Sequence, residues 1–157
     1  RSGSTPVGAW TSTTPAGKPD EHRKKDIVGI LAAHQVPYVA TASIAFQDDL
    51  ESKFKTAMET EGFRFLLLQT PCPTGWRSDS KDTIKIARLG VTSGLFPLLE
   101  VRGGRQWKIS HEPAFDGLDE YHDLQGRFST LTPEQREETR RFIENRWREL
   151  RSTASTG

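Results

Sequence analysis

The sequence predicts an α/β fold in which a mostly parallel sheet is flanked by helices and is followed by a β-hairpin and a C-terminal helix. Two short apolar runs, at residues 38–42 and 65–68, are typical of strands, and segments with helical spacing of apolar residues precede and separate them. This alternation indicates βαβ units with parallel strands. The length of 157 residues is enough for a domain with a real hydrophobic core.

The first elements follow from local composition. Residues 1–20 are rich in Gly, Pro, Ser and Thr, which excludes a helix or a central strand there. A helix is expected over about residues 24–34, because Pro37 cannot continue it. A short strand over 38–42 comes next, and then a helix over 46–59 whose first turn is acidic, as the positive end of a helix favours.

The stretch from residue 63 to residue 76 is the centre of the prediction. The apolar run at 65–68 is too short for a helix and too continuous for a half-exposed strand, so we expect a strand covered on both faces. Pro71 and Pro73 then end the sheet pairing and hold Cys72 in a fixed loop, with a turn at 74–75 and Trp76 packed beneath it. Ligands of open α/β sheets gather beyond the carboxyl ends of strands, where this loop should lie.

The second half has clearer boundary signals. A helix is expected over residues 83–93, closed by Gly94 in a left-handed conformation. Two strand-like runs on either side of residues 103–104 predict a β-hairpin. After a loose connection over 111–122, a helix should run from Pro133 to about residue 150, with Thr132 as its cap and Gln135 as a near capping box. Residues 152–157 should fray.

Composition narrows the class of protein. The net charge is +1 and the mean hydropathy is −0.63. A net charge this small gives no strong electrostatic attraction to nucleic acid or to an anionic membrane, so neither is expected as a partner. No apolar run approaches the roughly 20 residues of a membrane span. The single cysteine excludes an internal disulfide and nothing resembles a secretion signal, so we expect a reducing cytoplasm.

Cys72 is the main candidate for chemistry, and the residues alone leave three interpretations open. In the first, Cys72 is a small buried hydrophobic residue. In the second, it is a nucleophile activated by His34 or His111. In the third, it is a ligand of a metal or iron–sulfur cluster. One thiolate cannot hold such a cluster, so the third interpretation needs three ligands from outside this sequence. The histidines show no paired spacing for zinc, and the glycine-rich nucleotide-binding fingerprints are absent.

Several runs of the sequence resemble the thiamine-diphosphate-binding β subunit of pyruvate:ferredoxin oxidoreductase, also called pyruvate synthase. The resemblance covers nearly the whole chain to about residue 150 and corresponds to the carboxyl-terminal part of that subunit. Its most specific parts are the loop at residues 5–17 and the cysteine loop at residues 71–76. The other matching runs are residues 25–27, 32–34, 36–43, 87–89, 94–98 and 124–128.

The resemblance implies chemistry and cofactors. Family members decarboxylate a 2-oxoacid on thiamine diphosphate with Mg²⁺, pass electrons through 4Fe-4S clusters to ferredoxin, and form acyl-coenzyme A. Cys72 matches the fourth ligand of the cluster nearest the thiamine. Residues 1–20 match an active-site loop, in which Thr11, Thr13 and Thr14 are candidate cofactor contacts. No catalytic residue is expected in this chain.

The resemblance also implies an incomplete unit. The diphosphate-binding and metal-binding motifs and three cysteines of the family belong to the amino-terminal part of the β subunit and are absent here. We therefore expect a piece of a longer or processed polypeptide, inactive alone. Residues 1–101 would be the carboxyl-terminal part of the thiamine-diphosphate-binding domain, and residues 102–157 a hairpin, connection and helix extension.

The implied partners are that amino-terminal part, the alpha, gamma and delta subunits, ferredoxin and coenzyme A. Two other functions remain open. One is a branched-chain 2-oxoacid:ferredoxin oxidoreductase, whose β subunits share much of this pattern. The other is a non-catalytic interaction module derived from the same fold.

Overall fold

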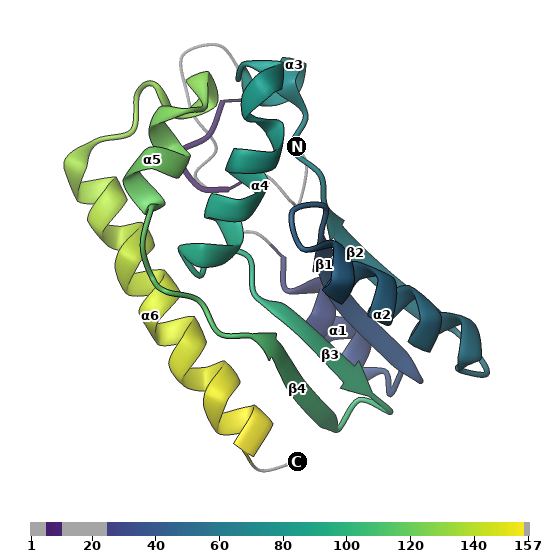
Figure 1. Cartoon of the computed structure of the whole chain (residues 1–157). Coiled ribbons are helices and arrows are strands. Elements are labelled where there is room, and N and C mark those ends of the chain that lie inside the picture. The colour runs from purple at the N-terminus through teal and green to yellow at the C-terminus, as the bar shows by residue number, and fades with distance from the viewer. Residues whose placement is uncertain (1–5, 11–24, 156–157) are drawn as a thin grey trace.

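The structure is a computed structural model that describes residues 6–10 and 25–155 (Figure 1). The described α-helices are α1 (Ile27–Ala33), α2 (Gln47–Glu59), α3 (Pro73–Trp76), α4 (Thr83–Thr92), α5 (Leu118–Asp123) and α6 (Pro133–Ser155). Two short 3-10 helices are η1 (Ser80–Asp82) and η2 (Gly126–Phe128). The described strands are β1 (Tyr38–Ser43), β2 (Arg64–Gln69), β3 (Leu98–Arg102) and β4 (Gln106–His111).

The described strands form one mixed sheet in the order β2-β1-β3-β4. Strands β1 and β2 are parallel and are linked through α2, which confirms the predicted βαβ unit. The predicted hairpin joins the same sheet, because β3 pairs antiparallel with both β1 and β4. Gly103 and Gly104 both have positive φ at the hairpin turn, as such a short connection requires. The α/β class is therefore confirmed.

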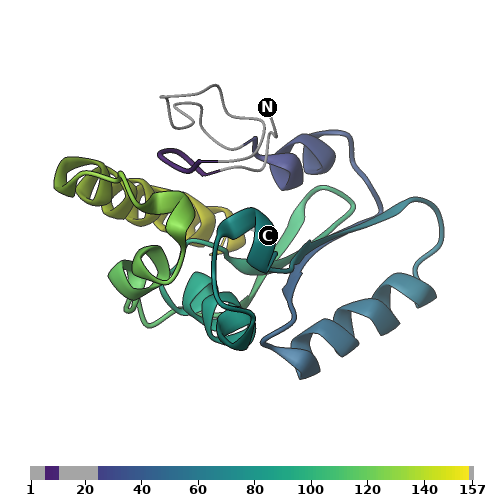
Figure 2. The same cartoon turned by 90° about the horizontal axis from the view of Figure 1, so that it is seen from above.

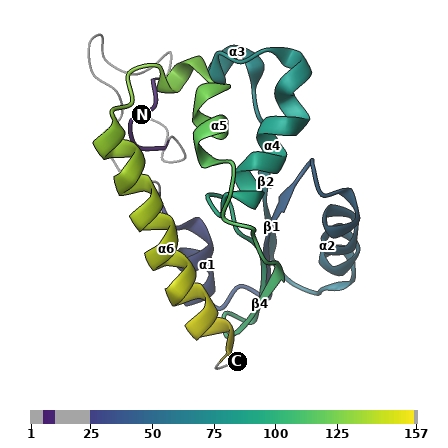
Figure 3. The same cartoon turned by 60° about the vertical axis from the view of Figure 1, so that its left-hand side comes forward.

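Helices cover the two faces of the sheet unequally. Figure 3 shows α1 and α6 on one side of the strands and α2 on the other, and Figure 2 shows α1 and α2 on opposite faces. The core between α1 and the sheet includes Val28, Ala32, Val39 and Val101, with Leu150 of α6 packed against it. Strand β1 is buried along its whole length, because it lies inside the sheet and under both helical layers.

Helix α2 is attached to the sheet through a buried ammonium group. The Nζ atom of Lys53 donates to the Asp49 carboxylate at 2.7 Å, to the Thr41 carbonyl oxygen at 2.8 Å and to Ser110 Oγ at 2.7 Å. These three acceptors match the three donors of a lysine ammonium. The charge is thereby compensated although the side chain is buried, and α2 is linked to both β1 and β4.

The structure corrects three expectations. Strand β2 is not covered on both faces: it lies at the edge of the described sheet and most of its side chains are partly or fully exposed. The connection over 111–122 contains the start of α5, whose six residues carry too little apolar periodicity to stand out. Helix α6 does not fray at residue 152 and continues to Ser155.

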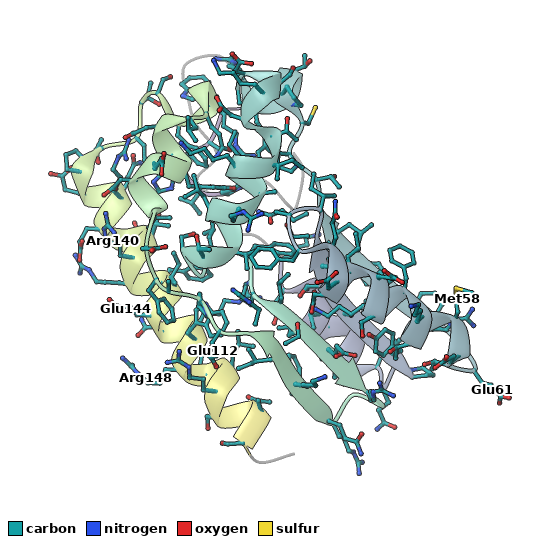
Figure 4. All side chains as sticks on the ribbon, viewed as in Figure 1. Met58, Glu61, Glu112, Arg140, Glu144 and Arg148 are labelled. Atoms are coloured by element: carbon teal, nitrogen blue, oxygen red, sulfur yellow. The ribbon has the colours of Figure 1, made fainter. Side chains whose placement is uncertain are left out.

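Helix α6 is held against the body by its apolar side and by ion pairs. Ile143 and Trp147 are buried, and the predicted capping box forms, because Thr132 and Gln135 exchange hydrogen bonds. Arg140 pairs with Asp119 of α5, and Arg151 pairs with Glu112, which lies beside the helix in Figure 4. Within the described residues, no helix has the length and apolar character needed to cross a bilayer.

Candidate functional site

The candidate site is a cavity of about 510 Å³ at the carboxyl ends of β1 and β2. Figure 1 shows α3, α4 and α5 gathered at this end of the sheet. The cavity touches Thr41 of β1, the end of β2 and the residues after it, the start of α1, Tyr121 and His122 of α5, and one side of α6. Its lining includes Val7, Asp26, Thr41, Leu67, Gln69, Thr70, Cys72, Trp76, Phe96, Tyr121, His122, Arg127, Phe128, Thr139 and Phe142. The location agrees with the rule for ligand sites in open α/β sheets.

Cys72 lies at the start of the short helix that follows β2. Its side chain is exposed, and its Sγ accepts a hydrogen bond from the Gly75 amide at 3.4 Å. Pro73 occupies the first helical position, where a missing N–H is tolerated. The loop predicted here is therefore a single helical turn, and it presents the thiol to solvent in one orientation. The interpretation of Cys72 as a small buried hydrophobe is wrong.

The segment after Cys72 is attached to η2 by a close backbone contact. Arg77 adopts a left-handed conformation with φ 54°, and its carbonyl oxygen accepts from the Gly126 amide at 2.9 Å. A Cβ atom on residue 126 would lie 3.0 Å from the Arg77 Cβ atom, which is closer than side chains normally approach. Glycine at residue 126 thus lets the cysteine turn and η2 lie in contact.

A buried cation borders the same turn. The guanidinium of Arg127 stacks on the Trp76 ring, its Nε donates to Gln125 Oε1 at 2.9 Å, and one terminal nitrogen donates to the Tyr121 hydroxyl at 3.2 Å. Among the described residues, no carboxylate pairs with it. Burial lowers the pKa of Arg127 and raises the pKa of Tyr121. Within the described part of the chain, the cavity wall therefore carries a positive charge among aromatic rings that no carboxylate compensates.

Two buried polar atoms in the cavity lining have no hydrogen-bond partner among the residues that the structure describes. They are Oε1 of Gln69, at the end of β2, and Nδ1 of His122, on α5. Burial lowers the pKa of His122 from 6.5 to about 4, and the positive charge of Arg136 acts in the same direction, so the imidazole is neutral at pH 7. Unpaired buried polar atoms are rare in folded proteins and often mark a place where a ligand or water binds.

The residues singled out from the sequence meet different outcomes. Cys72 lines the cavity, whereas His34 and His111 are not among its lining residues. No described hydrogen bond joins either histidine to the Cys72 thiol. Thr11, Thr13 and Thr14 lie outside the described residues, as does His22. No group of three or more His, Cys, Asp or Glu side chains in the described ranges could hold a metal ion. Cys72 as a cluster ligand therefore stays a prediction.

Sequence reasoning missed the polar atoms behind Cys72. Nothing near Gln69 or His122 in the sequence indicates that their side chains are buried beside one cavity. Arg127 lies in the run 124–128 that contributed to the family resemblance, but nothing local indicates burial of its charge. An isolated arginine flanked by glycine and phenylalanine is a weak signal, because arginine is usually exposed.

Comparison with known proteins agrees with the resemblance. No protein-family model matches the sequence. The chain is 41% identical over 98% of its length to Ketoisovalerate oxidoreductase subunit VorB of Pyrococcus abyssi. It is 39% identical over 96% of its length to Pyruvate synthase subunit PorB of Pyrococcus horikoshii, and 41% identical over 93% to the subunit of that name from Methanocaldococcus jannaschii.

The chain spans about half the length of these relatives, between 50% and 52% for the three named. The matched region is their carboxyl-terminal part. The chain is thus homologous to the carboxyl-terminal part of a group of oxidoreductase subunits, and the predicted resemblance is confirmed.

Proposed function

We propose that this chain forms the carboxyl-terminal part of the catalytic β subunit of a 2-oxoacid:ferredoxin oxidoreductase, acting in the cytoplasm within a larger complex. The favoured reaction is the reversible oxidative decarboxylation of pyruvate to acetyl-coenzyme A and CO₂. The observation that carries the proposal is the exposed, oriented thiol of Cys72 at the carboxyl end of β2, in a chain homologous to subunits of such enzymes.

The residues present fit one part of a cluster site. A 4Fe-4S cluster takes four thiolates, and Cys72 would supply one of them from a surface position that another polypeptide segment can reach. The Gly75 amide that donates to Sγ would also donate to a cluster-bound thiolate, which tunes its electron density. The other three thiolates would come from the amino-terminal part of the subunit.

The wall behind Cys72 suits an organic cofactor with negative charge. Thiamine diphosphate with Mg²⁺ would supply the decarboxylation chemistry. The described residues would contribute shape and electrostatics: the Arg127 cation, the neutral His122 ring, and the Gln69 oxygen, which has no partner in the described ranges, line a cavity with aromatic sides. We further propose that residues 1–20 act as the active-site loop, with Thr11, Thr13 and Thr14 near the cofactor.

A branched-chain 2-oxoacid is the second candidate substrate, because relatives named ketoisovalerate oxidoreductase are as similar to this chain as those named pyruvate synthase. Competition assays on the complete complex, with pyruvate and 2-oxoisovalerate as substrates, separate the two. The substrate with the higher kcat/KM identifies the enzyme. If the complex contains no iron and turns over neither pyruvate nor 2-oxoisovalerate, the non-catalytic interaction module is favoured.

Iron and labile-sulfide analysis of the complex tests the role of Cys72. We expect Cys72→Ser to lose the iron of one cluster, about four atoms per subunit, while Thr74→Ala in the same exposed turn retains it. Equal iron in Cys72→Ser and the unmodified complex would show that Cys72 is not a ligand.

A further inference from the structure

Arg127 carries a buried charge that several contacts hold in one place. The residue is 4% exposed. Its guanidinium lies within cation–π distance of the Trp76 and Phe128 rings. Its Nε donates to Gln125, and one terminal nitrogen donates to the Tyr121 hydroxyl. A charge held by this many neighbours cannot swing toward a ligand, so it acts on its surroundings through its electric field.

The backbone joins Arg127 to the helical turn that begins at Cys72. The Gly126 amide donates to the Arg77 carbonyl oxygen at 2.9 Å, directly beside Arg127 in the chain. Within the turn, the Trp76 amide donates to the Cys72 carbonyl oxygen at 2.8 Å. The ring on which the guanidinium stacks therefore belongs to the same helical turn as the candidate cluster ligand. Side-chain stacking and a backbone hydrogen bond both fix the cation relative to Cys72.

The exposed cations near this turn are in a different environment. Arg77, on the turn itself, is exposed. Lys81 pairs with Asp79 at 3.1 Å, and both side chains are more than half exposed. Water and salt screen such charges, whereas a buried charge acts through a medium of low dielectric constant. Among the described residues no carboxylate pairs with Arg127, so neither solvent nor an anion in that part of the chain weakens its field.

We propose that Arg127 is a positioning residue for electron transfer: it holds the Cys72 turn through Trp76, and its buried charge raises the reduction potential of the cluster bound by Cys72. This inference rests on the proposed function, because it takes Cys72 to be a cluster ligand. Reduction adds one electron to the cluster, and a nearby fixed cation stabilises the added negative charge. A higher potential makes the cluster a better acceptor of the electron released by oxidation of the 2-oxoacid.

Redox titration of the complete complex with dithionite tests the role of the charge. The cluster is identified as the one whose spectroscopic signal Cys72→Ser removes. We expect Arg127→Met to shift the equilibrium about tenfold toward the oxidised cluster, a fall of about 59 mV in the potential of a one-electron couple. Arg127→Lys loses the flat stacking as Arg127→Met does but keeps the charge, so the equilibrium should stay within about threefold of that of the unmodified complex.

Two further variants separate charge from packing. Gln125→Glu keeps the arginine and places a carboxylate oxygen where Gln125 Oε1 accepts from Arg127 Nε at 2.9 Å. Because this anion compensates the cation, we expect a shift in the same direction as in Arg127→Met, of at least about threefold. Arg77→Gln is the matched control, since it removes an exposed charge from the same turn, and the equilibrium should stay within about twofold.

Iron content and melting temperature identify any variant that does not fold or does not hold the cluster. If Arg127→Met is such a variant, the shift in Gln125→Glu decides whether the charge acts on the cluster.

The outcomes separate the inference from the proposed function. Equal shifts in Arg127→Met and Arg127→Lys would show that Arg127 acts through packing alone, which overturns the inference. A potential that neither Arg127→Met nor Gln125→Glu changes would overturn it as well. Both results leave the proposed function intact, because the cluster still depends on Cys72. If Cys72→Ser removes no cluster, the proposed function is contradicted and the inference is overturned with it.

Discussion

The guanidinium carbon of Arg127 lies 3.7 Å from the centroid of the Trp76 ring. This contact joins the helical turn after Cys72 to the connection before α6, two segments about fifty residues apart in the sequence. The orientation of the candidate cluster ligand therefore depends on a residue from a distant part of the chain.

Replacing Arg127 should disturb both stability and the cysteine turn. Lysine cannot stack flat on Trp76 while also donating to Gln125 and Tyr121, so we expect Arg127→Lys to lower the free energy of unfolding by about 1–3 kcal/mol. Urea denaturation measures this. The exposed Arg141→Lys is the control and should change stability by less than about 0.5 kcal/mol. Equal stability of the two variants would mean that the stacking contributes nothing.

His122 should make stability depend on pH in a defined window. Its pKa is about 4 in the fold and 6.5 in the unfolded chain, so the unfolded chain binds more protons between these values and stability rises with pH. As pH falls from 6.5 to 4, we expect a loss of about 2–3 kcal/mol from this residue.

Comparing variants isolates that contribution. Asp119, Asp123, Arg136 and Arg140 act on His122. Although burial opposes it, the hydrogen bond with Arg140 lowers the pKa of Asp119, so the stabilising contribution of Asp119 is also lost on acidification. Urea denaturation at several pH values should therefore show a shallower pH dependence for His122→Gln than for the unmodified protein. The exposed His34→Gln should keep the full dependence. Parallel curves for all three proteins would contradict the prediction.

Gly94 should be hard to replace because of its neighbours. It has φ 79°, and an added Cβ atom would lie 2.8 Å from Trp147 Nε1 and 3.0 Å from Ile143 Cγ2. Its carbonyl oxygen also accepts from the same Trp147 nitrogen at 2.8 Å. We expect Gly94→Ala to cost about 2–4 kcal/mol, through backbone strain and displacement of α6.

Gly103→Ala is the matched substitution. Residue 103 also has positive φ, at 56°, but nothing lies within 4 Å of an added Cβ atom. We expect about 1 kcal/mol of destabilisation from the backbone alone. Thermal unfolding of both variants gives the comparison, and a Gly103 variant as unstable as the Gly94 variant would refute the clash with α6.

Lys53 should matter far more than its neighbour Lys55. Both pair with an acidic residue four positions earlier, but Lys53 is buried and Lys55 is exposed. We expect Lys53→Met to lower the free energy of unfolding by about 3 kcal/mol, because Asp49, Thr41 and Ser110 lose a shared donor. Lys55→Met should leave it nearly unchanged, because exposed ion pairs contribute little.

A double variant checks the cause. Adding Asp49→Asn to Lys53→Met removes the carboxylate left without its partner, so part of the lost stability should return. Chemical denaturation of the single and double variants measures this coupling. Strictly additive losses would show that the two side chains do not interact.

Local sequence was sufficient for most elements. Proline and glycine punctuation set the ends of α1 and α4, and the Thr132–Gln135 pair marked the start of α6, because these signals act within a few residues. The position of Cys72 beyond a strand end was predicted for the same reason. Helix α5 was missed because its six residues offer no sustained periodicity.

The sequence by itself determined where most of the helices and strands lie, that β2 is apolar toward both faces, and that Cys72 follows it on a rigid turn. Only the tertiary structure decided that β2 is the edge of the described sheet and that Gln69, His122 and Arg127 are buried around one cavity. The physical reason is that periodicity and capping are local properties of the chain, whereas burial depends on which distant segments pack together. A strand's sequence can require cover on both faces without stating which polypeptide provides it.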